Sequence, residues 1–192
     1  MERGGRWRMT FPWLRRLLKD QRGTLAVEMA IAMPILIALL LSGVEVTRFV
    51  LLNQKIERAS STMADLTSQA EILAEGDLVN LFTASGYVVE PFDLAADGHI
   101  IVSSISMLGT ASPVINWQRG FGAGSGASIF GVEGANAVLP TGFVIRDGES
   151  VIVAEAFYDF TPIFSGGVMS ASTLSRYSIL RPRFGALTTL LP

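Results

Sequence analysis

The 192-residue chain contains no cysteine and a single histidine, His99. The missing cysteines exclude disulfide bonds, thiolate metal ligands and a lipid-modified cysteine anchor. A lone histidine at the start of a strand is more often a turn or surface residue than a ligand or a general base. No cluster of histidine and acidic residues has metal-ligand spacing. We therefore expect a protein that is not an enzyme, with no metal and no cofactor.

One long stretch of the chain, from Met29 to Val44, contains no charged side chain. A helix rises ~1.5 Å per residue, so about 20 apolar residues cross the ~30 Å hydrocarbon core of a bilayer. We predict a transmembrane helix over residues 24–52. Glu28 is a charged residue near the start of this otherwise apolar helix. Inserting an acid at the centre of a membrane span costs about 2.5–3.5 kcal/mol of free energy. An acid placed there requires a reason.

The charges that are present divide by sign along the chain. Residues 1–23 carry seven basic and two acidic side chains, whereas residues 53–192 carry seven basic and thirteen acidic ones. By the positive-inside rule the N-terminus is cytoplasmic and the C-terminal domain lies across the membrane. Nucleic-acid binding needs a basic folded domain. The acidic domain therefore predicts no nucleic-acid partner.

A short motif precedes the apolar run: Gly23, then Glu28 five residues later, then the helix. This order resembles the processing site of type IV prepilins. More narrowly, it is similar to the TadE/TadG-like minor pseudopilins of the tight-adherence (Tad/Flp) pilus system, although Met29 stands where an aromatic residue is usual. The positions that carry the resemblance are Gly23, Ala26, Val27, Glu28, Ala30, Pro34, Gly43, Glu45 and Arg48.

The resemblance implies a function and its partners. A prepilin peptidase would cut between Gly23 and Thr24, and the Glu28 carboxylate would then pair with the new terminal ammonium of a neighbouring subunit. The chain would be a minor pseudopilin in the bacterial inner membrane, with a periplasmic domain, that helps to assemble a Tad-type pilus or secretion apparatus. Its partners would be the peptidase, other pilin or pseudopilin subunits, the inner-membrane Tad platform and membrane lipid.

Five further residues of the helix carry structural interpretations. Ala26 and Ala30 form a small-xxx-small pair that lets another helix approach closely. Pro34 removes a backbone donor, so it marks either a kink or a packing site. Glu45 and Arg48 lie three residues apart at the far interface and can pair with each other, and Arg48 can also reach lipid headgroups.

We predict an α+β fold, pilin-like, with a long N-terminal helix packed on a small antiparallel sheet. Apolar residues at spacings of three and four extend the helix to about Glu75, where Gly76 ends it and Asp77 caps the next. The predicted segments are a basic leader (1–23), a transmembrane helix (24–52), an amphipathic periplasmic extension (53–75) and a periplasmic α+β domain (76–192). β-rich segments predict strands over residues 99–107, 114–120, 150–164 and 174–185.

Residues 120–134 contain six glycines and predict a mobile loop that adds little to a core. They lack the Lys-Ser/Thr pair of a phosphate-binding loop.

Two other functions stay open. The chain could be an unprocessed single-pass scaffold of the same machinery. It could also be a membrane-anchored periplasmic binding module, which the scarcity of histidine and of site motifs disfavours.

Overall fold

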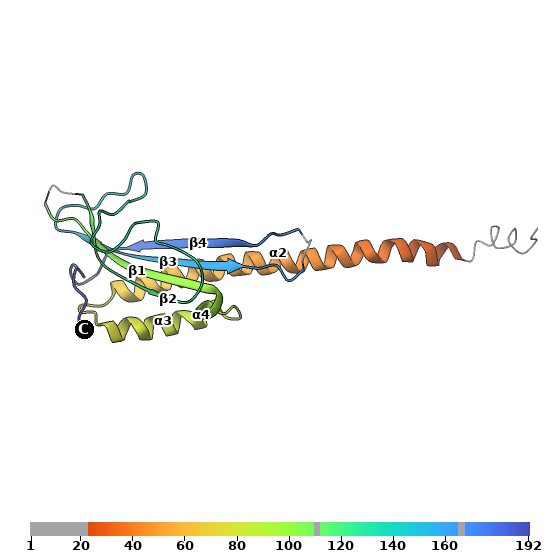
Figure 1. The fold of residues 1–192 in the computed structure, drawn as a ribbon, viewed down its shortest axis with the longest axis horizontal. Coiled ribbons are helices and arrows are strands. Elements are labelled where there is room, and N and C mark those ends of the chain that lie inside the picture. The colour runs from red at the N-terminus through yellow and green to blue at the C-terminus, as the bar shows by residue number, and fades with distance from the viewer. Residues whose placement is uncertain (1–22, 110–111, 165–167) are drawn as a thin grey trace, which may run out of the picture. The chain divides into compact units, whose positions relative to one another are not determined.

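The computed structural model describes residues 23–109, 112–164 and 168–192, so the predicted leader lies outside the described residues except for Gly23. The chain divides into two compact units, one up to Gly43 and one from Val44 to Pro192. The elements, drawn in Figure 1, are α2 (Thr24–Ser68), α3 (Glu75–Val89), α4 (Leu94–Asp97), β1 (Gly98–Ser106), β2 (Val114–Phe121), β3 (Ser150–Phe160) and β4 (Ser172–Leu180).

The described part of the N-terminal unit is the first part of α2. Its large apolar side chains are exposed, among them Leu36 and Leu40. Among the described residues, α2 is the one helix long and apolar enough to cross a membrane, by length and composition. The unit thus exposes an apolar helical surface of the kind that lipid or other helices can cover.

The C-terminal unit is built on a four-stranded antiparallel sheet with the order β2-β1-β3-β4. The central strands β1 and β3 are buried along almost their whole length. The β1–β2 hairpin contains a bulge at Asn116, which places Ile115 and Trp117 on opposite faces of the sheet. The fold is α+β, as predicted, and the four predicted strands are present. β3 ends at Phe160 and β4 at Leu180, both before the predicted ends.

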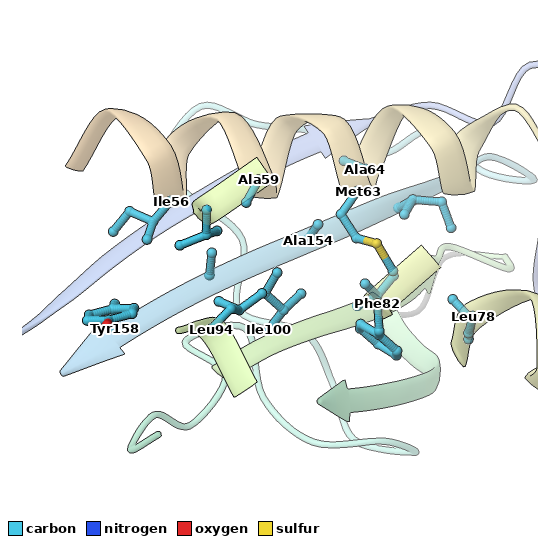
Figure 2. Close-up of a cluster of buried hydrophobic side chains, with 14 of the residues drawn as sticks. Ile56, Ala59, Met63, Ala64, Leu78, Phe82, Leu94, Ile100, Ala154 and Tyr158 are labelled. Atoms are coloured by element: carbon cyan, nitrogen blue, oxygen red, sulfur yellow. The ribbon is translucent and has the colours of Figure 1, made fainter. Parts of the chain in front are cut away.

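One face of the sheet is covered by the second part of α2 together with α3 and α4. Figure 2 shows the side chains that meet there, including Ile56 and Met63 of α2, Phe82 of α3, and Ile100 and Ala154 of the sheet. All five are buried. The predicted packing of the membrane-distal part of the long helix on the sheet is therefore confirmed.

The long helix ends at Ser68, so the prediction that it reaches Glu75 is wrong. The C-terminal tail explains the break, because the Arg183 amide donates to the Ser68 carbonyl at 2.9 Å. The Leu191 amide donates to the Leu73 carbonyl, also at 2.9 Å. The tail thus provides partners for backbone groups that a continuing helix would have bonded internally.

The predicted cap of the second helix is also wrong. α3 begins at Glu75, with Ala74 at the N-cap position, so Gly76 and Asp77 lie inside its first turn. Asp77 Oδ2 accepts a hydrogen bond from the Ala74 amide at 3.1 Å. Asp77 therefore acts as the third residue of a capping box instead of as the cap.

The other face of the sheet is covered by the glycine-rich segment and the residues that follow it. Phe130 and Ile145 are buried there against Ile105, Val151 and Val153. The prediction that residues 120–134 add little to a core is therefore wrong. Their glycines permit close approach of the backbone to the sheet, which composition alone did not indicate.

Candidate membrane and assembly site

The predicted processing bond lies at the start of α2. Thr24 is the first residue of the helix, and both Gly23 and Thr24 are exposed. A Cβ at position 23 would have no described atom within 4 Å. Cleavage itself stays a prediction.

The other predicted assembly residues lie within the next three turns of α2. Ala26, Ala30 and Pro34 follow each other at four-residue spacing, so they share one face of the helix. Glu28 lies two residues from each alanine and therefore faces a different direction. All four are exposed. The described chain thus presents Glu28 and the small-residue face to its surroundings on separate sides of one helix.

Glu45 occupies a place that sequence reasoning did not predict. Its side chain is 1% exposed, and its two carboxylate oxygens lie 3.1 and 3.2 Å from the Ile163 amide nitrogen, which donates to them. Ile163 lies just after β3 and 118 residues from Glu45 in the chain. Glu45 therefore fixes the β3–β4 connection to α2. A contact across that separation leaves no signal in local spacing.

Arg48 lies one turn further along α2 and faces both Glu45 and two aromatic rings. Its Nη1 is 3.5 Å from Glu45 Oε1, the pair that three-residue spacing permits. Its guanidinium carbon is 5.9 Å from the ring centroids of Phe92 and of Phe160. This distance is within the range of a cation–π interaction. The placement of this pair at a membrane interface stays a prediction.

Two carboxylates of β3 hold the glycine-rich segment against the sheet. Glu155 accepts from the Ser128 hydroxyl and from the Ile129 amide, the latter at 2.8 Å. Burial raises the pKa of the Glu155 carboxyl above its ordinary value. Asp159 accepts from the amide and hydroxyl of Ser125, and these hydrogen bonds lower the pKa of Asp159. Both acids therefore have a structural role that their sequence positions did not indicate.

The C-terminal unit also contains an open cavity of about 410 Å³ beside α3 and α4. Its lining combines the aromatic side chains of Tyr87, Phe92 and Phe121 with the acidic residues Glu90 and Asp93. Such a lining suits a small apolar or cationic group. The sequence did not indicate this cavity, because its walls come from two helices, the connection between them and a strand.

Histidine and acidic residues do not form a metal centre within residues 23–109, 112–164 and 168–192, where no group of three or more potential ligands occurs. His99 Nδ1 lies 3.0 Å from the Gly122 carbonyl oxygen, in a half-buried position on β1. It thus helps to position the start of the glycine-rich segment.

Residues 23–65 match the family model described as TadE-like protein. Over this segment the chain is similar to TadE-like proteins. The match begins at Gly23 and includes Glu28, Glu45 and Arg48, so the resemblance that the motif predicted is found over this segment. It covers less than a quarter of the chain and leaves the sheet unmatched. No curated protein and no solved structure matches the chain.

Proposed function

We propose that the chain is a minor pseudopilin that takes part in assembling a Tad/Flp-type pilus or secretion apparatus. A prepilin peptidase cleaves it between Gly23 and Thr24. The observation that carries the proposal is the TadE-like match over residues 23–65, which coincides with an exposed apolar helix containing one early acid. A candidate membrane span and a folded domain after it suit a subunit of membrane-based machinery.

The mechanism follows from the chemistry of the processed end. Cleavage gives Thr24 a charged amino group, one helical turn from the Glu28 carboxylate. In an assembly, the ammonium of one subunit pairs with Glu28 of its neighbour. Such a pair is strong in low-dielectric surroundings, where an unpaired charge is expensive. It would therefore set the register of one helix against the next, while Ala26 and Ala30 allow close contact.

The proposed role is structural, not catalytic. Assembly requires a membrane helix, a register-setting charge and a domain surface, and these are the features that the described chain offers. We place the N-terminus in the cytoplasm and the domain in the periplasm, because the basic residues precede the span and the acidic excess follows it.

Glu28→Ala tests the proposal in the native host. Loss of a charge-assisted pair of about 1.5–3 kcal/mol predicts a drop in piliation of about tenfold or more, with membrane insertion retained. Glu57→Ala is the matched control, because Glu57 is another exposed glutamate of α2. Equal piliation in both variants and the parent would remove Glu28 from the mechanism.

The cavity of about 410 Å³ supports a second candidate, the membrane-anchored binding module, because its volume falls in the range of small-molecule sites. This second function can be tested by screening small aromatic and cationic compounds against the full chain in detergent. The measured quantity is the shift in the melting temperature of the protein. A compound whose stabilisation is lost in Phe121→Ala would support this function. The unprocessed scaffold is the remaining alternative, and it predicts a chain that keeps its leader.

A further inference from the structure

The connection between β3 and β4 carries an exposed apolar surface, here called the β3–β4 surface and formed by Ile163, Phe164, Val168 and Met169. Ile163 is 58% exposed and Val168 is 70% exposed, while Phe164 and Met169 are half-buried beside them. No charged residue occurs in the sequence between Asp159 and Arg176. An uncharged stretch with exposed branched side chains is poorly suited to water.

The β3–β4 surface is attached to α2 close to the end of the candidate membrane span. The Ile163 amide donates to both oxygens of the buried Glu45, so the β3–β4 surface is fixed at that residue. Glu45 is the second residue after Gly43, where the exposed apolar unit ends. Val46 and Val50, on the following turns of α2, are also exposed. Exposed apolar side chains therefore also occur on α2 in the residues of the C-terminal unit that follow Gly43.

The charged residues near the β3–β4 surface favour membrane lipid as the group that contacts it. Arg48 is the first basic residue after the apolar run, and its side chain is 32% exposed beside Glu45. Arginines at the end of a span extend to headgroup phosphates while their stems remain on apolar surface. Glu45 is an acid in direct contact with this surface, and its carboxylate oxygens already accept from the Ile163 amide and pair with Arg48.

We propose that the β3–β4 surface enters the headgroup–acyl boundary of the bilayer that holds residues 24–43. The domain then contacts the membrane through a second element, and Glu45 is the residue that positions this element. The proposal rests on the membrane anchoring in the proposed function. It extends that function by naming a lipid-contacting surface on the folded domain.

The absence of cysteine from the chain makes a direct test possible. Val168→Cys in the full-length protein carries an environment-sensitive fluorophore, and the protein is reconstituted into phosphatidylcholine–phosphatidylglycerol vesicles with spin-labelled lipid. Val144→Cys is the matched control, because Val144 is also a loop valine that is 70% exposed. We expect a blue-shifted emission at position 168, and quenching by a shallow spin label at least twice as strong as at position 144. Ile163→Cys should give the same result as Val168→Cys.

A label at position 36, inside the apolar unit, separates this proposal from the anchoring. Quenching at position 36 together with water-like emission at positions 163 and 168 would overturn the β3–β4 proposal and leave the anchoring intact. Water-like emission at all positions would overturn both. Protection of position 168 that requires a second membrane protein would overturn lipid as the occupant.

Discussion

Glu45 illustrates how a single buried charge is accommodated. Removal of its carboxylate breaks the hydrogen bonds from the Ile163 amide and the ion pair with Arg48, and a hydrogen bond to a charged group contributes about 1.5–3 kcal/mol. We predict a loss of this size in the free energy of unfolding for Glu45→Ala, measured by urea titration of the full chain in detergent. Glu45→Gln should lose less, because its amide oxygen can still accept. Equal losses in the two variants would show that the hydrogen bond does not matter.

Glu155 and Asp159 should give opposite pH dependences. The pKa of Glu155 is raised from 4.5, so the folded state holds its proton more tightly than the unfolded state. Its contribution to stability is complete below about pH 4.5 and is lost as the pH rises through the higher folded pKa. The pKa of Asp159 is lowered from 3.8, so its contribution is present above that value and is lost on further acidification.

The check is urea unfolding over a pH series for Glu155→Gln and Asp159→Asn. The first variant should show a smaller fall in stability with rising pH above about 4.5, and the second a smaller fall below about 3.8. Slopes unchanged from the parent would contradict both assignments.

Gly126 is required where the glycine-rich segment crosses β3. Its φ is +156°, and a Cβ there would lie 2.5 Å from Cγ of Phe157. Gly126→Ala should therefore destabilise the protein by about 1–3 kcal/mol, as overpacking and backbone strain do. Gly134 also has a positive φ, but a Cβ there would meet no atom within 4 Å. Gly134→Ala therefore measures the cost of backbone strain without the cost of a steric clash. Thermal unfolding of both variants measures the difference, and equal effects would refute the contact with Phe157.

At the scale of elements, the second part of α2 should owe its stability to the sheet. Met63 is 1% exposed in the core, whereas Leu66 on the same helix is 39% exposed. Met63→Ala should lower the free energy of unfolding by about 2–5 kcal/mol, and Leu66→Ala by much less. Urea titration measures both. Comparable losses would mean that α2 does not pack as described.

The elements that the sequence predicted are those with strong local patterns. Alternating β-branched and aromatic residues located the four strands, and the apolar run located α2. The end of α2 could not be predicted, because residues 69–74 contain neither glycine nor proline and the tail that ends the helix is over 100 residues away. The core role of the glycine-rich segment was missed for a similar reason. Its contacts with Glu155 and Asp159 are long-range.

Among the site residues, local spacing predicted contacts within one helix. It did not predict contacts between residues that are far apart in the sequence. The three-residue separation of Glu45 and Arg48 suggested their pairing, and the TadE-like motif located the candidate processing and assembly positions. The binding of Glu45 to Ile163 and the cavity near Tyr87 required the tertiary structure. Glycine-rich composition was a poor guide in particular, because small residues serve close packing as well as mobility.

At the scale of the whole molecule, we propose that the candidate span, the TadE-like segment and the α+β domain form one subunit of a membrane machine. This proposal depends on the processing that creates a charged N-terminus able to pair with Glu28 of a neighbouring subunit. If the leader stays, the terminal ammonium lies far from Glu28 in sequence, and the register-setting pair cannot form at that position.

The most direct measurement is the mass and N-terminal residue of the protein from native membranes, with and without the host's prepilin peptidase. The proposed processing predicts a chain that begins at Thr24 when the peptidase is present and at Met1 when it is absent. A chain that keeps Met1 in both strains would contradict the processing, leave a membrane-anchored scaffold as the function, and require another explanation for Glu28.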